Sequence, residues 1–136
     1  MAFLEGTVAC NVGVQQIDDD HIAIVKIANE LDKAIAGGIE RSQLIPILDR
    51  LIAVTTQHFK HEEAAFDKAG YPNAATHKGQ HSVAVAMAKQ FHHELLHAGT
   101  SHHTLELLAL IKGWFLLHVE HEDKDFGAFL KSRTIR

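Results

Sequence analysis

Two pairs of residues near the middle of the chain have the spacing of metal ligands on a helix. His58 is followed four residues later by Glu62, and His77 is followed four residues later by His81. At about 100° per residue, the two members of an i, i+4 pair lie about 40° apart on one face of an α-helix. Imidazole and carboxylate groups are ligands for iron, zinc, copper and manganese. The two residues of each pair can therefore bind at one metal site.

Further ligand types occur on both sides of these pairs. Towards the C-terminus the sequence offers His118 with Asp123, an i, i+5 pair about 140° apart on an α-helix, or His121 with Asp125 at i, i+4. Spacing alone slightly favours the second pair. Near the N-terminus, His21 follows three aspartates. Five imidazoles and two carboxylates that can bridge fit a dinuclear centre better than a single tetrahedral zinc ion.

The chain holds 12 histidines but only one tyrosine and one tryptophan. Five of the remaining histidines gather where the third and fourth expected helices meet, and they are expected to be solvated because no set of ligands completes them: His92, His93, His97, His102 and His103. His61 lies about 60° beyond the His58 face and is expected to flank the site rather than bind metal. Glu63 and Glu120 are expected to face solvent.

Four long stretches carry apolar residues at three- and four-residue spacing, and almost none alternates as a half-buried strand does. This pattern predicts an all-α protein with helices at residues 19–36, 42–69, 73–97 and 102–130. Asp18 to Asp20 stand where an acidic N-cap of the first helix belongs. Short connections predict an up-down-up-down antiparallel four-helix bundle with a short N-terminal arm, with sites facing the bundle core. Residues 1–136 are expected to form one domain.

Composition argues against several classes of function. The formal charge of −4 argues against nucleic acid as a partner, because phosphate binding depends on clustered Lys and Arg. No apolar run approaches the roughly 20 residues of a membrane span. The first residues lack the pattern of a secretory signal, so we expect a cytoplasmic location. Cys10 is the single cysteine, which excludes an internal disulfide and a CxxC haem attachment.

Four segments of the chain resemble the ligand motifs of the hemerythrin family, in particular those of the bacterial hemerythrins. They are VGVQQIDDDH ending at His21, HFKHEEAAF with His58 and Glu62, GYPNAATHKGQH with His77 and His81, and WFLLHVEHED with His118 and Asp123. Four motifs in the family's order are far more specific than any one of them. The family places a tryptophan, here Trp114, four residues before the ligand. The resemblance therefore selects His118 with Asp123 over His121 with Asp125.

This resemblance implies two iron ions and no haem. It assigns His77, His81 and His118 to one iron and His21 and His58 to the other. Glu62 and Asp123 would bridge the two irons. A solvent-derived oxo or hydroxo group would be the third bridge. The two-histidine iron would then be one ligand short of six, and dioxygen would bind at that position. A dry pocket is required there, and its candidate lining residues are Ile22, Phe59, Trp114, Phe115 and Val119.

The function implied by the resemblance is reversible dioxygen binding, for transport, storage or sensing, rather than enzymatic turnover. The main alternative is a di-iron oxidase or peroxidase, but such sites on similar bundles are richer in carboxylates and ExxH pairs. Another is a regulatory module in which oxygen or redox state changes helix packing for a partner. Two positions depart from the family: FLEGTVAC lacks the tryptophan of many bacterial members, and Phe66 replaces a common methionine. Neither is a ligand position, but both bear on the tightness of the pocket.

Overall fold

A computed structural model describes residues 14–98 and 101–134 of the chain. In chain order its elements are α1 (Gln15–Ala36), α2 (Arg41–Ala69), α3 (Ala74–Ala98), α4 (His102–Leu117), the π-helix η2 (His118–Asp123) and α5 (Lys124–Thr134). The described residues contain no strand, so the predicted all-α class is confirmed. Among these residues, no helix combines the length and apolar character that a membrane crossing requires.

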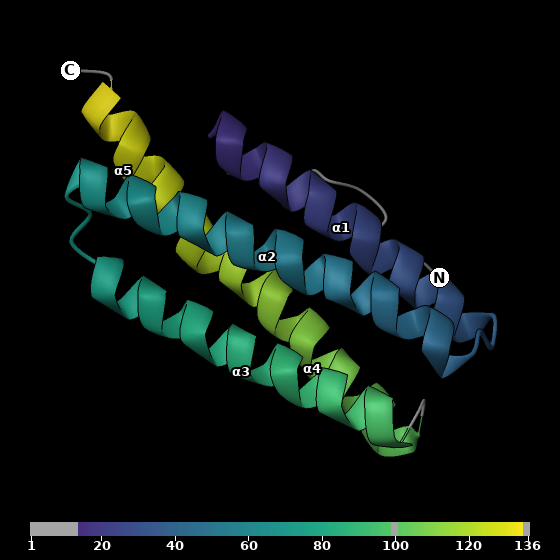
Figure 1. Cartoon of the computed structure of the whole chain (residues 1–136). Coiled ribbons are helices and arrows are strands. Elements are labelled where there is room, and N and C mark those ends of the chain that lie inside the picture. Colours follow the sequence, from purple (N-terminus) through teal and green to yellow (C-terminus); the bar gives the residue numbers. More distant parts are fainter. Residues whose placement is uncertain (1–13, 99–100, 135–136) are drawn as a thin grey trace.

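Figure 1 shows the helices packed side by side in a bundle, with successive long helices running in opposite directions. α1 packs on α2, α2 on α3 and α3 on α4, while η2 and α5 continue the line of α4. The expected N-terminal arm lies outside the described residues. This arrangement turns one side of each helix towards a shared interior, where side chains from different helices can meet.

The helix ends follow local chemistry, with one correction to the prediction. α1 begins at Gln15, four residues earlier than predicted, and its N-cap is Val14, which makes no side-chain cap bond. The acidic residues therefore lie within the first turns, where negative charge is favourable beside the helix N-terminus. α2 ends at Ala69, and its C-cap Gly70 has a φ of 67°, a left-handed conformation that glycine adopts without strain. α4 starts with a side-chain cap, because the Ser101 hydroxyl accepts a hydrogen bond from the Thr104 N–H.

The fourth predicted helix, 102–130, is interrupted. A six-residue π-helix separates α4 from α5, and the Lys124 N–H at its end reaches the carbonyl of Val119, five residues earlier. Such i→i+5 turns occur mostly as single insertions in α-helices, often at functional sites. Periodicity in the sequence could not reveal this change, because it covers less than two turns. It alters which residues between His118 and Asp123 share a face.

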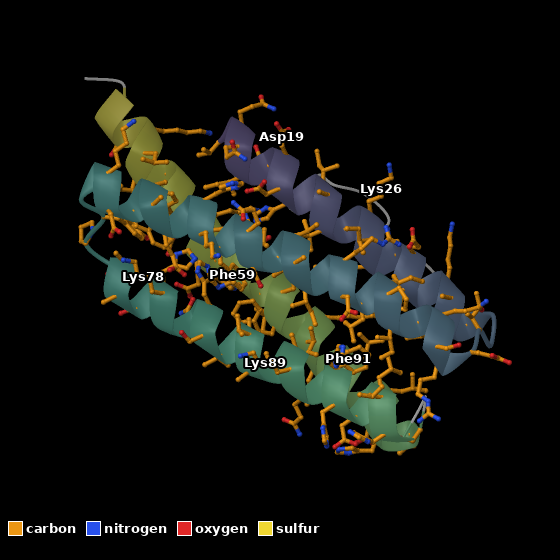
Figure 2. The ribbon with its side chains drawn as sticks, in the orientation of Figure 1. Asp19, Lys26, Phe59, Lys78, Lys89 and Phe91 are labelled. Atoms are coloured by element: carbon orange, nitrogen blue, oxygen red, sulfur yellow. The ribbon has the colours of Figure 1, made fainter. Side chains whose placement is uncertain are left out.

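Two apolar clusters form the core, one towards each end of the bundle. The cluster here called the Phe66 cluster has the buried members Ile17, Ile24, Val25, Phe66, Tyr71, Phe115, Val119 and Phe126. The Leu31 cluster has Leu31, Ala34, Leu44, Leu48, Phe91, Leu95, Leu107 and Leu108. Figure 2 shows Phe59 and Phe91 in the space between the helices, whereas Lys78 and Lys89 extend along the outer side of α3.

Candidate metal centre

Seven polar side chains meet inside the bundle, beside the Phe66 cluster. They are His21 on α1, His58 and Glu62 on α2, His77 and His81 on α3, and His118 and Asp123 on η2. None is more than 5% exposed. Charged and imidazole side chains are seldom buried so completely unless they have partners of opposite charge or a metal. The structure therefore brings together all seven residues that the resemblance pointed to.

The seven residues form two overlapping sets of possible ligands. One set contains Glu62, His77, His81, His118 and Asp123, and the other contains His21, His58, Glu62 and Asp123; within each set the ligand atoms lie within 4.8 Å of one another. The two carboxylates belong to both sets, whereas each imidazole belongs to one. A carboxylate has two oxygen atoms and can bind one ion with each. This division is the one that a pair of bridged ions requires.

The oxygens of Asp123 point to different sets. Oδ1 lies 2.9 Å from Nε2 of His77 and 3.0 Å from Nε2 of His118. Oδ2 lies 2.9 Å from Nε2 of His21. Asp123 thus faces two histidines of the larger set with one oxygen and a histidine of the smaller set with the other.

Glu62 is divided in the same way. Oε1 lies 2.9 Å from Nε2 of His81 and 3.1 Å from Nε2 of His77. Oε2 lies 3.8 Å from Nε2 of His58. Two ligand atoms at right angles around one ion, each about 2.1 Å from it, are about 3 Å apart. The separations around Oε1 match neighbouring ligands of a single ion.

Several of these atoms lack hydrogen bonds although they lie close together. Within the described part of the chain, six buried side-chain atoms have no partner of suitable geometry: Nε2 of His58, both carboxylate oxygens of Glu62, Nδ1 of His77, Nε2 of His81 and Oδ1 of Asp123. An unsatisfied buried polar group costs about 1–3 kcal/mol, and more when it is charged. Five of the six face the centre, so a cation there would satisfy them. The residues present fit a pair of metal ions.

The π-helix positions the last two of the seven residues. On an α-helix His118 and Asp123 would point about 140° apart, whereas a π turn places residue i+5 above residue i. Nε2 of His118 and Oδ1 of Asp123 are consequently only 3.0 Å apart. His121 and Asp125, which simple helical spacing slightly favoured, are both exposed. That preference was wrong because it assumed a regular α-helix.

Comparison with known proteins places this arrangement in a family. The family model "Hemerythrin HHE cation binding domain" matches residues 12–130. The chain belongs to the hemerythrin family. The bacteriohemerythrin of Methylococcus capsulatus is 32% identical over 135 residues, which cover 97% of this chain and 100% of that protein. That of Stenotrophomonas maltophilia is 26% identical over 132 residues, covering 97% and 84%. No solved structure gave a significant match.

Membership of the hemerythrin family implies a non-haem di-iron centre and dioxygen binding. The cluster of histidines and carboxylates inside this chain could hold such a metal centre. The surface histidines near the turn between α3 and α4 do not form a comparable set. They make separate contacts instead: His92 with Asp49 at 3.0 Å, His102 with Glu106 at 2.6 Å, and the His93 ring with the His97 ring.

Three of the buried imidazoles are oriented by side chains behind them that the sequence did not identify. Nδ1 of His58 lies 2.9 Å from Asp20, Nδ1 of His81 lies 2.8 Å from Glu63, and Nδ1 of His118 lies 3.1 Å from the amide oxygen of Gln80. An imidazole that donates its Nδ1–H keeps the lone pair of Nε2 for a metal. These three acceptors thus fix the tautomer that the centre needs.

The prediction that Glu63 faces solvent was wrong, whereas the prediction that His61 only flanks the site agrees with the structure. Glu63 was expected to face solvent, but its side chain is only 33% exposed because it accepts the hydrogen bond from His81. His61 lies outside both ligand sets, as its angle on the helix predicted. Its Nδ1 is 3.1 Å from Asp20, the residue that also holds His58. The position of Glu63 directly after Glu62 in the sequence gave no sign that it binds His81, because His81 lies on another helix.

Aromatic rings cover the imidazoles. Phe59 stacks on His81 with ring centroids 3.9 Å apart and 9° between planes, and Trp114 stacks on His118 at 4.5 Å and 11°. Phe115 meets a third imidazole, that of the α1 histidine, edge-on at 5.9 Å. Apolar rings at these distances exclude water from the metal side of the ligands.

One of the five expected pocket residues points away from the centre. Ile22 is 45% exposed, because it follows His21 by one residue and so points about 100° away from it. It therefore does not line a buried pocket, and the expectation was wrong. Val119 is 1% exposed and packs in the Phe66 cluster, as Phe115 does, so its place in the pocket stays a prediction. Sequence position next to a ligand is a poor guide to pocket walls, since neighbours on a helix face different directions.

The electrostatics of the seven residues depend on burial and mutual contact. Burial raises the pKa of Glu62 to about 8, although its contact with His77 opposes the rise. For His77, burial lowers the pKa, but contacts with Asp123 and Glu62 outweigh it and raise the value to about 9. Burial and the neighbouring imidazoles lower the pKa of His81 to about 2. Burial would raise the pKa of Asp123, but three histidines hold it well below its usual value. Without metal, protons on Glu62 and His77 thus take the place of a bound cation.

Proposed function

We propose that this chain is a reversible dioxygen-binding protein with a di-iron centre inside a single-domain, up-down-up-down bundle. The observation that carries the proposal is the division of both carboxylates between two imidazole sets. On this assignment one iron is held by His77, His81 and His118, the other by His21 and His58, and both by Glu62 and Asp123. A pair of iron ions held by these residues would supply the two electrons that reversible reduction of bound dioxygen requires.

The histidine count favours two unequal iron sites. Three imidazoles surround one position and two surround the other, with the same pair of carboxylates at both. The position with fewer protein ligands has more room for an exogenous ligand. We therefore assign dioxygen to the side of His21 and His58, where the ring of Phe115 lies edge-on to His21.

The surrounding side chains support binding rather than turnover. The side chains of Phe59, Trp114 and Phe115 keep water away from the imidazoles that they cover. Asp20 and Glu63 each accept a hydrogen bond from a proposed ligand, so they orient that ligand and do not reach the centre themselves. With few carboxylates, the ligand set differs from the carboxylate-rich sites of di-iron oxidases on related bundles. We propose no enzymatic activity for the chain.

The test is an oxygen titration of the full chain after anaerobic reduction, with visible spectra recorded and iron counted. Two irons per chain and a charge-transfer band that appears with oxygen and fades on its removal are expected. One iron, or zinc in place of iron, would refute the dinuclear assignment. Bleaching with net consumption of oxygen would instead identify an oxidase.

A further inference from the structure

α3 carries two pairs of histidines with the same four-residue spacing. His77 and His81 lie near its start and are buried, whereas His93 and His97 lie near its end and are exposed. Each member of the second pair comes sixteen residues after its counterpart, which is a rotation of about 160° on an α-helix. The two pairs therefore lie on nearly opposite sides of the helix, and the second pair meets solvent.

The rings of the exposed pair are placed like two ligands of one ion. The ring centroids of His93 and His97 are 4.4 Å apart, with 52° between the ring planes. The buried pair of the same helix has 4.7 Å and 62°, and the His77 and His118 rings are 4.5 Å apart. Two imidazoles at right angles around an ion, each bound through nitrogen at about 2.1 Å, have centroids about 4.5 Å apart. The exposed pair already has this spacing.

The nitrogen atoms of the exposed pair are available for a ligand from solvent. Among the residues that the structure describes, neither His93 nor His97 makes a hydrogen bond or an ion pair. Three more histidines near the turn between α3 and α4 each lie within 4.0 Å of a carboxylate: His92 of Asp49, His102 of Glu106 and His103 of Glu94. The pair thus differs from its neighbours in having imidazoles that face each other.

The surroundings of the pair favour a late transition metal over iron. No group of three ligands in the described part of the chain includes the pair. Glu94 follows His93 directly, but its carboxylate is 4.0 Å from His103 on α4. Two imidazoles with water in the other positions suit Cu²⁺, which binds nitrogen ligands most tightly among the first-row divalent ions. A cation is also favoured near the C-terminal end of a helix, where the helix dipole is negative.

We propose that His93 and His97 form a second metal site, which binds one Cu²⁺ ion from solvent through two imidazoles and water. Ni²⁺ and Zn²⁺ bind there more weakly, as the general order of these ions requires. The site shares none of the seven residues of the candidate metal centre, and His93 is about 18 Å along α3 from His81. It does not rest on the proposed function.

The experiment is a Cu²⁺ titration of the full chain, as purified and again after metal removal, followed by ¹H–¹⁵N NMR. Cu²⁺ is paramagnetic and broadens the signals of nearby nuclei, so the spectrum reports where each ion lies. Signals from the last turns of α3 should broaden and saturate with one ion in both forms. Signals around the candidate metal centre report separately on any Cu²⁺ that enters it.

The first variant is His97→Ala, which leaves a single imidazole. The second ligand of a pair binds intramolecularly, so its loss should weaken Cu²⁺ binding at the end of α3 at least about tenfold. The matched control is His103→Ala, which removes another exposed histidine from the same end of the bundle and should bind as the unaltered chain does. Alanine is the best helix former, so neither variant should lose its fold.

A second variant rebuilds the pair one turn earlier. Lys89 precedes His93 by four residues and extends along the outer side of α3 (Figure 2). Lys89→His in the His97→Ala background restores the four-residue spacing, so we expect Cu²⁺ binding to recover.

Three outcomes would overturn the proposal: no saturable broadening at the end of α3, equal Cu²⁺ affinity in the His97 and His103 variants, or no recovery with Lys89→His. Saturable Cu²⁺ binding at the end of α3 in a chain that does not take up two irons would support this site and count only against the proposed function.

Discussion

The two ends of the bundle bury different kinds of side chain. Around the Leu31 cluster the interior is aliphatic and aromatic, with Leu44, Leu48 and Leu95 at most 2% exposed. Beside the Phe66 cluster, the same four-helix geometry encloses five imidazoles and two carboxylates. Burial of apolar surface stabilises a fold by itself, whereas burial of polar groups without partners destabilises it. The Leu31 end therefore holds only stabilising apolar packing, whereas the packing of the Phe66 cluster at the other end must also accommodate the buried polar groups.

This difference suggests that fold and site can be damaged separately. A change at the metal end should mainly alter what the protein binds, because the Leu31 cluster stays intact. A change at the apolar end should mainly alter the free energy of unfolding. Each prediction below sets one end against the other or divides the metal end further.

The largest effect is expected from His77→Ala. His77 lies within 3.1 Å of an oxygen of each carboxylate, so its loss removes a ligand from the larger set and weakens the hold on both carboxylates. We expect most of the bound iron to be lost while the helical content measured by circular dichroism persists. His121→Ala is the matched control from the exposed side of η2 and should keep the full iron content. Retention of two irons in the His77 variant, or their loss in the His121 variant, would contradict the assignment.

The opposite result is expected from Leu48→Ala at the apolar end. Leu48 is 2% exposed within the Leu31 cluster, and truncation of a buried leucine to alanine costs about 2–5 kcal/mol. Urea unfolding should show this loss, while the iron content of each folded chain stays unchanged. Leu110→Ala is the control, since Leu110 is 65% exposed and its change should be within about 0.5 kcal/mol. Loss of iron in folded Leu48→Ala protein would show that the ends are not independent.

The sequence predicted the helical class and the approximate helices because both depend on periodicity that extends over many residues. Short features were harder. The first helix was predicted to start at residue 19 because the acidic residues before it resemble an N-cap. Acidic residues can also occupy a first turn, and the helix starts at Gln15. The π-helix that aligns His118 with Asp123 is six residues long and leaves no periodic trace. Only the family motif, with its Trp114, pointed to the pair that lies in the buried cluster.

The candidate site was predictable for the residues with motif spacing and not for those that support them. Asp20, Glu63 and Gln80 contact imidazoles on other helices, 38, 18 and 38 residues away in the chain. Such contacts depend on how helices pack, which no local pattern records. Ile22 shows the opposite error. It was expected to line the pocket because it follows a ligand in the sequence, but its side chain is exposed.

A smaller effect is expected from Glu63→Gln, which tests the layer behind the ligands. The glutamine keeps an acceptor for the Nδ1–H of His81 but removes the negative charge that favours it. Loss of such an outer partner typically weakens metal affinity 10- to 100-fold. Competition with a chelator should show a weakening towards the lower end of this range. Glu120→Gln is the matched control, because Glu120 is exposed and pairs with Lys124. Equal affinities in the two variants would remove Glu63 from the centre.

The last prediction concerns pH and the protein freed of metal. Glu62 and His77 have pKa values raised to about 8 and about 9, so between pH 6.5 and 9 the folded chain binds more protons than the unfolded chain. The free energy of unfolding should therefore fall as pH rises through this window, by at most about 1.4 kcal/mol per pH unit for each extra proton. The lowered pKa of His81 acts below pH 6.5, where it makes stability rise with pH.

Metal should abolish the fall, because a cation displaces the protons from Glu62 and His77. Urea unfolding at several pH values, with and without metal, measures both slopes. The Leu48→Ala variant should be less stable at every pH yet show the same slope in its metal-free form, since it changes only the apolar end. A slope that Leu48→Ala alters, or that persists with metal bound, would mean that the titrating groups are not those of the centre. Unequal slopes in the unaltered chain and the Leu48→Ala variant would also show that the apolar end and the metal end are not independent.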